Sequence, residues 1–216
     1  MKTLAIETSG RSFGVALSEN GTLVCEIFLN AGLFHSEKLI PSIEKLFAFA
    51  GWTPKELEKI AVCVGPGSFT GIRVGMACAK TMAQQLGIGL VGKDSLSILK
   101  SGVPEGPYEI CPLIDALRDE VYVLSRRGIS ELKTAEEYLN SFKGKKKPLM
   151  FVGSGAVKYR ELIKKKTGKF AHFAPEAMND PRAGVLALMA AEEKGSKQEK
   201  ILPLYIRRSW AEEKRK

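Results

Sequence analysis

The chain has 216 residues, of which 44% are apolar and 26% are charged, and its formal net charge is +9. This length fits one large domain or two small ones, and either can bury a substantial core. No apolar run approaches the roughly 20 residues that a membrane-spanning helix needs, and Glu7 interrupts the apolar start, so we expect neither a membrane span nor a signal peptide. Four scattered cysteines without a Cys-x-x-Cys pair indicate reduced thiols in a cytoplasmic protein.

The positive charge is unevenly distributed along the chain. Residues 1–110 contain ten basic and ten acidic residues, so the whole excess lies in residues 111–216. It gathers at 143–147, at 164–166 and in the tail from 207 to 216. Such asymmetry fits an acidic partner such as RNA, and it fits equally well a set of solvated helix ends and a frayed terminus.

The first half predicts three strands followed by alternating helices and strands. Apolar residues alternate through the first thirty positions, and Asn20-Gly21 is a preferred two-residue hairpin turn, so these strands are expected to be antiparallel. Apolar spacing then predicts an amphipathic helix at about 35–50. A strand at 60–64, a helix at about 69–86 and a strand at 88–92 complete the series.

The second half repeats this order of elements less clearly. Strands are expected at 108–114, 121–125 and 149–152, and helices at 134–142, 156–166 and about 181–194. No residue-level repeat is visible, so the inferred duplication rests on element order alone. We therefore expect an α/β protein with two adjoining subdomains, residues 1–105 and 106–216, and a cleft between them.

The stretch VGPGSFTGIRVG, residues 64–75, is a glycine-rich turn between a strand and a helix. It lacks the lysine of a P-loop, and Thr70 stands where a dinucleotide fingerprint has its third glycine. Two interpretations remain. In the first, the helix N-terminus, with Ser68 and Thr70 as candidate caps, binds an anion. In the second, Gly67 only turns the chain and Ser68 only caps the helix.

Small residues recur every four positions in the helix that follows: Gly71, Gly75, Ala79 and Ala83. They form one stripe along the helix. A glycine inside a helix costs about 1 kcal/mol relative to alanine, so close packing against a helix or a sheet is expected to compensate.

Six motifs together resemble the TsaB family, also called YeaZ, over nearly the whole chain. They are IETS at 6–9, HSEKLIP at 35–41, GPGSFTGIR at 65–73, IDALRDEVY at 114–122, VGSGA at 152–156 and PLYIR at 203–207. The resemblance implies an actin-like ATPase (ASKHA) fold of two RNase H-like subdomains with mixed sheets. It also implies a non-catalytic subunit of the complex that forms N6-threonylcarbamoyladenosine at position 37 of tRNAs that read ANN codons.

The resemblance also implies partners. They are the catalytic paralogue TsaD, the ATPase TsaE, tRNA as the substrate of the complex, and a second copy of the chain when it is alone; no membrane is involved. Two helices from each chain would form the interface, with the small-residue stripe at its centre. The expected interface residues are His35, Leu39, Ile43, Phe69, Gly71, Arg73, Gly75, Ala79 and Ala83.

A nucleotide site within this chain alone is not expected. The candidate nucleotide- or anion-binding residues are Glu7, Thr8, Ser9, Gly67, Ser68, Asp115, Gly153 and Gly155. However, Ala116 and Leu117 follow Asp115 where active relatives have glycines, and their side chains would crowd a phosphate. ATP or ADP at the interface with TsaD remains the cofactor expectation.

The sequence offers no set of residues typical of a metal site. It has no His-x3-His pair, which disfavours the metal-dependent glycoprotease activity once ascribed to this superfamily. We therefore expect no metal and no catalytic residue. The alternative function is an active phosphotransferase of the ASKHA type.

Overall fold

The computed structural model describes residues 1–30, 35–125 and 127–207, without the side chain of His35. It divides the chain into two compact units. The first contains Met1–Ile98 and Arg182–Tyr205, and the second contains Leu99–Pro181 together with Ile206 and Arg207.

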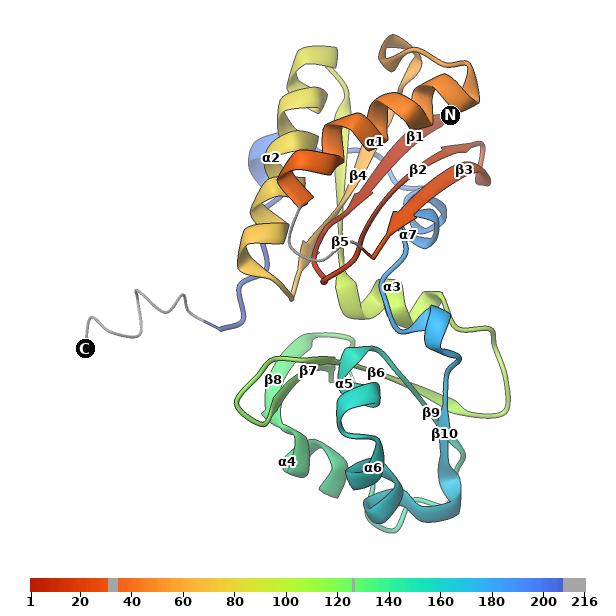
Figure 1. Cartoon of the computed structure of the whole chain (residues 1–216), viewed down its shortest axis with the longest axis vertical. Helices are drawn as coiled ribbons and strands as arrows, with labels where there is room; N and C mark the ends of the chain where they lie inside the picture. Colours follow the sequence, from red (N-terminus) through yellow and green to blue (C-terminus); the bar gives the residue numbers. More distant parts are fainter. Residues whose placement is uncertain (31–34, 126, 208–216) are drawn as a thin grey trace, which may run out of the picture. The chain divides into compact units, whose positions relative to one another are not determined.

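The first unit is a five-stranded mixed sheet with helices on both faces (Figure 1). The strand order is β3-β2-β1-β4-β5; β1, β2 and β3 are antiparallel, whereas β4 and β5 run parallel to β1. Its elements are β1 (Lys2–Glu7), β2 (Phe13–Glu19), β3 (Thr22–Leu29), α1 (His35–Ala50), β4 (Lys59–Gly65), α2 (Phe69–Leu86), β5 (Gly89–Asp94) and α7 (Ala183–Met189).

The second unit repeats this topology with the strand order β8-β7-β6-β9-β10. Here β6, β7 and β8 are antiparallel, whereas β9 and β10 are parallel to β6. The expected α/β fold with duplicated element order is confirmed. The elements are β6 (Glu109–Asp115), β7 (Glu120–Leu124), β8 (Ser130–Thr134), α4 (Ala135–Asn140), β9 (Leu149–Val152), α5 (Ser154–Lys158), α6 (Arg160–Thr167) and β10 (Ala171–Phe173); α3 (Ser95–Ser101) begins in the first unit and ends in the second.

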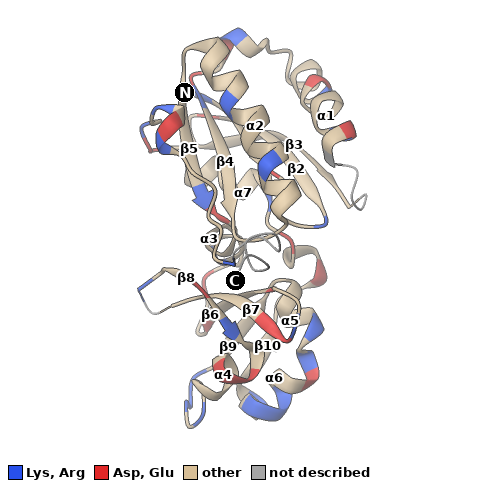
Figure 2. Cartoon of the chain, turned by 90° about the vertical axis from the view of Figure 1, so that its left-hand side faces the viewer, with Lys and Arg blue, Asp and Glu red and all other residues tan. Residues whose placement is uncertain are grey.

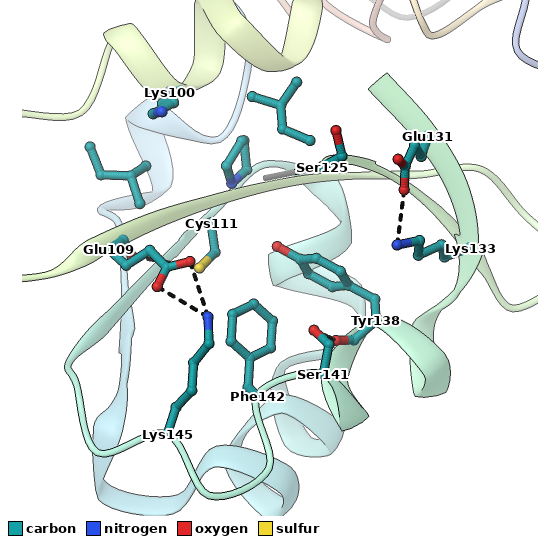
Figure 3. A pocket seen from close by; sticks show the side chains of 13 residues that line it. Lys100, Glu109, Cys111, Ser125, Glu131, Lys133, Tyr138, Ser141, Phe142 and Lys145 are labelled. Atoms are coloured by element: carbon teal, nitrogen blue, oxygen red, sulfur yellow. Dashed lines mark hydrogen bonds and ion pairs between the residues drawn. The ribbon is translucent and has the colours of Figure 1, made fainter. Parts of the chain in front are cut away.

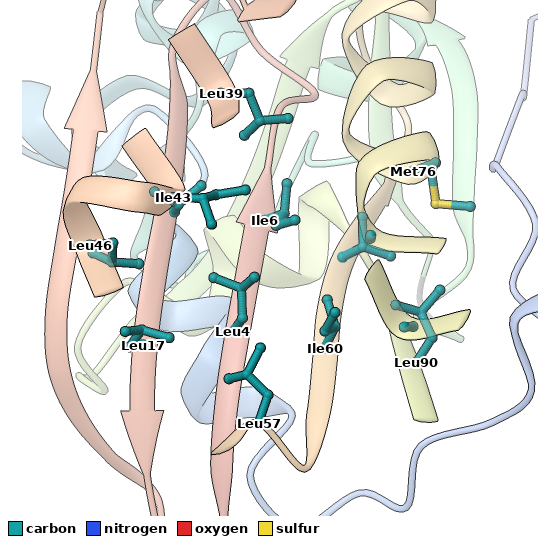
Figure 4. Packing of buried hydrophobic residues seen from close by; sticks show 14 of the residues in the cluster. Leu4, Ile6, Leu17, Leu39, Ile43, Leu46, Leu57, Ile60, Met76 and Leu90 are labelled. Atoms are coloured by element: carbon teal, nitrogen blue, oxygen red, sulfur yellow. The ribbon is translucent and has the colours of Figure 1, made fainter. Parts of the chain in front are cut away.

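The two faces of the first sheet bury side chains of different size. Leu4 and Ile6 of β1 point toward α1 and α2, where they meet Leu39, Ile43 and Met76 (Figure 4). Successive strand residues face opposite sides, so Ala5 points toward α7. Ala16 and Ala61 lie in the same cluster, and these small side chains let α7 pack close to the sheet.

Helix α7 is held to the first sheet by one charge at each end. The carboxylate of Glu26 on β3 accepts hydrogen bonds from the N–H of Gly184 at 3.1 Å and from the guanidinium of Arg182 at 2.9 and 3.1 Å. At the other end the buried ammonium of Lys59 donates to the carbonyls of Ala190, Ala191 and Glu193. An anion at the N-terminus and a cation at the C-terminus both complement the helix dipole.

Because α7 packs on the first sheet, the boundaries of the two units differ from those expected from the sequence. The expected C-terminal subdomain ran unbroken from residue 106 to 216, whereas residues 182–205 pack with the first unit. The reason is that the alanine-rich face of the first sheet needs a covering helix, and α7 provides it. The first unit is therefore built from two separate stretches of the chain.

Two edge strands and one short α-helix were not predicted from the sequence. Strands β8 and β10 lie at the edge of their sheet, and α3 has only seven residues. β8 is half-buried at four of its five positions, so no alternation of apolar and polar residues marks it. In addition, the single helix expected at 156–166 is divided at Tyr159 into α5 and α6.

Lys59→Met should lower the free energy of unfolding by about 2–3 kcal/mol, the scale of a hydrogen bond to a charged group. Methionine keeps the apolar stem of the side chain but leaves the carbonyls at the end of α7 without their donor. Chemical denaturation measures the change. Lys55→Met, at an exposed position of the same unit, is the control and should stay within about 0.5 kcal/mol of the parent. Equal stability of the two variants would contradict the role of Lys59.

Candidate functional site

The glycine-rich stretch that stood out in the sequence connects β4 to α2. Ser68 is the N-cap of α2, and its Oγ accepts a hydrogen bond from the N–H of Gly71 at 3.2 Å. The N–H of Ser68 donates to the carbonyl oxygen of Ser9 at 2.7 Å. The loop is thus bonded directly to the turn that follows β1.

Two glycines are required where this loop and helix α2 approach β1. A Cβ atom added to Gly67 would lie 2.2 Å from the carbonyl oxygen of Ser9, which is backbone and has little room to move. A Cβ atom added to Gly75 would lie 2.2 Å from Oγ1 of Thr8. Both distances are far below van der Waals contact. These glycines therefore serve close packing of α2 on the first strand.

The turn Glu7-Thr8-Ser9 is buried and engaged in this packing. The Oε1 atom of Glu7 accepts hydrogen bonds from the N–H of Ser9 at 2.8 Å and from its hydroxyl. The hydroxyl of Thr8 donates to the carbonyl of Gly71 at 2.8 Å. Burial, together with the neighbouring Glu7, raises the pKa of the Cys63 thiol well above its usual value. The Glu7 carboxylate has no exposed surface to present to a ligand.

Asp115 occupies the corresponding position after β6 in the second unit. Its carboxylate accepts two hydrogen bonds from the ammonium of Lys158, at 2.9 and 3.1 Å, and one from the N–H of Leu117 at 3.0 Å. The hydrogen bond to Asp115 raises the pKa of Lys158. A cation of this protein therefore already neutralises Asp115.

The turn after Asp115 adopts a conformation that glycine usually supplies. Leu117, Arg118 and Asp119 have φ angles of 61°, 52° and 59°, in the left-handed region. The guanidinium of Arg207 donates to the carbonyl of Ala116 at 2.5 Å and bonds Glu120, which fixes both ends of the turn. The backbone thus follows a glycine-like path while carrying full side chains.

Gly153 and Gly155 also serve packing. A Cβ atom on Gly153 would lie 2.4 Å from the carbonyl oxygen of Leu113, and one on Gly155 would lie 3.0 Å from it. The N–H of Gly153 donates to the side-chain oxygen of Asn179 at 2.8 Å. The segment therefore brings α5 against β6. Helix α5 has only five residues, too few to act as an N-terminal anion site.

The expected interface residues divide into buried and surface groups. Six of them are buried in the first unit: Leu39, Ile43, Gly71, Gly75, Ala79 and Ala83. The small-residue stripe is buried in its own unit, where Gly75 meets Thr8, so its side chains are not exposed to a partner in this structure. The side chain of His35 lies outside the described residues. Phe69 and Arg73 do reach the surface, where the Arg73 guanidinium lies 3.7 Å from the Phe69 ring centre and bonds the Tyr205 hydroxyl at 3.0 Å.

A pocket of about 540 Å³ in the second unit was not anticipated (Figure 3). It opens where β6 and β7 part: they pair only from Leu113 to Asp115 on β6, and Pro112 has no N–H with which to continue the ladder. The proline inside the expected strand at 108–114 is the sequence feature that could have indicated this break in the strand pairing. Cys111 and Tyr138 line the pocket.

The chemistry of this pocket argues against a nucleophile. Burial raises the pKa of Cys111 to about 12 and that of Tyr138 well above its usual value, so both stay protonated at neutral pH. At the rim, the ammonium of Lys145 pairs with the carboxylate of Glu109 at 3.2 Å (Figure 3).

The described part of the chain holds neither a candidate metal centre nor a membrane-spanning helix. No group of three or more His, Cys, Asp or Glu side chains in it converges to hold a metal ion. Among its helices, none combines the length and apolar character needed to cross a bilayer.

Comparisons with known proteins agree over most of the chain. The family model described as TsaD, tRNA N6-adenosine threonylcarbamoyltransferase, matches residues 30–215. The tRNA threonylcarbamoyladenosine biosynthesis protein TsaB of Bacillus subtilis is 30% identical over 223 aligned positions, which cover 99% of this chain and 97% of that protein.

Solved structures show the same fold. YeaZ from Pseudomonas aeruginosa superposes with a TM-score of 0.77 at 25% identity and covers 94% of this chain and 99% of its own. A ROK hexokinase from Thermus thermophilus, with a TM-score of 0.50 at 11% identity over 87% of this chain and 97% of its own, shares the fold alone. The expected actin-like architecture is thereby confirmed.

Gly75→Ala should lower the free energy of unfolding by about 1–3 kcal/mol, the usual cost of overpacking. The new methyl group would displace Thr8 and break its hydrogen bond to Gly71. Adding Thr8→Ala removes the clashing hydroxyl, so the double variant should lose less stability than the sum of the two single variants. Denaturant titration of all four proteins completes the cycle. Additive losses would show that the two residues do not press on each other.

Proposed function

Because the chain belongs to the TsaB family, we propose that it acts in the biosynthesis of threonylcarbamoyladenosine in tRNA, the process for which its Bacillus subtilis relative is named. We further propose that it is a cytoplasmic, non-catalytic subunit that pairs with a TsaD-like paralogue, is joined by a TsaE-like ATPase, and forms a homodimer when alone. The modified position would be residue 37 of tRNAs that read ANN codons.

The main support for a non-catalytic role is that the two loop carboxylates, Glu7 and Asp115, are both engaged within this chain. An ATP-hydrolysing relative needs carboxylates and close backbone at its phosphate loops. Here Glu7 is buried and bonded to Ser9, and Asp115 is paired with Lys158. The loops that would cradle phosphates are instead used to pack the protein. This supports assigning any ATP or ADP to the interface with the TsaD-like partner.

A partner surface on the outer sides of α1 and α2 fits the exposed residues better than the stripe does. Ile40 and Phe49 of α1 are large apolar side chains that are 48% and 75% exposed; they lie nine residues apart, so they flank the buried face of α1 on opposite sides. Ala77 and Thr81 of α2 are small and exposed, which would let another helix approach. An interface of standard size would bury roughly 800 Å² on each partner.

An omission experiment tests the proposed role. The chain, a TsaD-like protein and a TsaE-like protein are purified separately and incubated with ATP, threonylcarbamoyl-AMP and an unmodified tRNA that reads an ANN codon. Modification should require the chain, and the chain alone should show no transfer, kinase or protease activity. Turnover by the repurified chain that vanished with Asp115→Ala would contradict the non-catalytic role and favour the phosphotransferase.

Ile40→Asp combined with Phe49→Asp should leave the fold intact and abolish both self-association and pairing with the TsaD-like protein. Two exposed apolar side chains would become charges that an interface cannot bury cheaply. Analytical ultracentrifugation and co-purification measure the loss. Ala79→Trp is the contrast: because Ala79 is fully buried, it should reduce thermal stability rather than produce a folded monomer. A folded Ala79→Trp monomer would return the interface to the stripe.

A further inference from the structure

We propose that the exposed lysines at the α4–α6 end of the second unit form a binding surface for the phosphate backbone of RNA. This inference rests on the proposed role in tRNA modification and names the part of this chain that would contact the tRNA. We call this surface the lysine face and define it by Lys143, Lys146, Lys147, Lys165 and Lys169, which are all exposed.

The members of the lysine face come from two segments that the fold brings together (Figure 2). Helix α6 packs against α4, and the ammonium of Lys166 bonds Glu136 at 2.7 Å and Asn140 at 2.9 Å. Asn140 ends α4, three residues before Lys143. The run at 143–147 therefore begins beside the last turn of α6, which carries the second group of lysines.

The structure separates neutralised lysines from available ones, which the sequence could not do. Lys145 is paired with Glu109 at 3.2 Å, Lys164 with Glu161 at 2.8 Å, and Lys166 with Glu136. The five lysines of the lysine face form no ion pair with any described residue. Their positive charge is free to attract an anion.

The local charge exceeds what helix stability explains. Cations in the last turn of α6 complement the helix dipole, but that effect is worth at most about 1 kcal/mol at a surface. Residues 135–147 and 160–169 contain nine basic residues against three acidic ones. Four of the nine lie in the 143–147 run, beyond the end of α4.

The surroundings of the lysine face favour RNA over a protein or a membrane. Protein interfaces are rich in aromatic residues and poor in lysine, and membrane-surface helices carry large apolar side chains beside their lysines. Within 135–147 and 160–170, the described residues include no large apolar side chain among the exposed ones. Lys169 lies over the half-buried ring of Phe170 at 5.6 Å, so its neighbour is not an exposed apolar side chain. Exposed lysines without large exposed apolar side chains beside them are the pattern of backbone phosphate recognition.

The test compares two triple variants of equal net charge. The first, Lys146→Gln with Lys147→Gln and Lys165→Gln, removes three charges from the lysine face. The matched control, Lys194→Gln with Lys197→Gln and Lys200→Gln, removes three exposed charges from a cluster in the first unit. The affinity of each full chain for an in vitro transcribed tRNA that reads an ANN codon is measured between 50 and 200 mM salt. Circular dichroism confirms that both variants are folded.

We expect the lysine-face variant to reduce the slope of log affinity against log salt by about two to three, the value for three lost phosphate contacts. Its affinity at 50 mM salt should fall at least tenfold, while the control stays within about twofold of the parent. The inference would be overturned if the parent chain did not bind tRNA, or if both variants lost tRNA affinity equally. If the lysine-face variant lost binding to anionic vesicles but kept its tRNA affinity, the lysine face would be a membrane-binding surface, and the inference would be overturned as well.

The outcome is separable from that of the proposed function. If the parent binds tRNA through the lysine face and the omission experiment shows no dependence on the chain, the proposed function fails and the RNA-binding surface stands. If the lysine-face variant keeps its tRNA affinity and still supports modification, the inference fails and the proposed function stands.

Discussion

Two opposite charges at the ends of α7 determine how the first unit is built. Glu26 bonds the first turn of the helix, and Lys59 bonds the carbonyls that follow its last turn. Both side chains come from the sheet, so the helix is fixed in position and direction by the strands that it covers. The helix covers the alanine face of the sheet, and because it comes from residues 182–205, the first unit consists of two separate stretches of the chain.

Much of the fold was predictable because periodicity and turns follow local physics. The hairpin turn at Asn20-Gly21 has the positive φ angles that its residue types favour, 50° and 78°, and the expected helix at 35–50 has those bounds. The failures have one common cause. The place of α7 depends on contacts with residues more than a hundred positions away, and the edge strand β8 is stabilised by its neighbour rather than by its own pattern.

The site was less predictable, because residue type alone does not show whether a side chain is exposed to a ligand or partner or is buried against its own chain. The excluded phosphate motifs and the small-residue stripe were visible in the sequence, but the partner of that stripe was not. Gly75 faces Thr8 of its own chain. Likewise, the sequence shows Asp115 but not Lys158 beside it, since 43 residues separate them. The pairing of carboxylates and lysines emerges only when distant segments meet.

The discontinuity of the first unit bears on how the protein is synthesised. A ribosome releases β1 to β5 first, but the alanine face of their sheet stays uncovered until α7 follows, about ninety residues after β5. The strands of the second unit are all made in that interval, so this unit can complete its sheet while the first still exposes an apolar surface. Nascent chains stalled before α7 therefore expose the apolar face of the first sheet, and such exposed apolar surface is what chaperones bind and where aggregation begins. The last part of the first unit to be translated is the part that closes it.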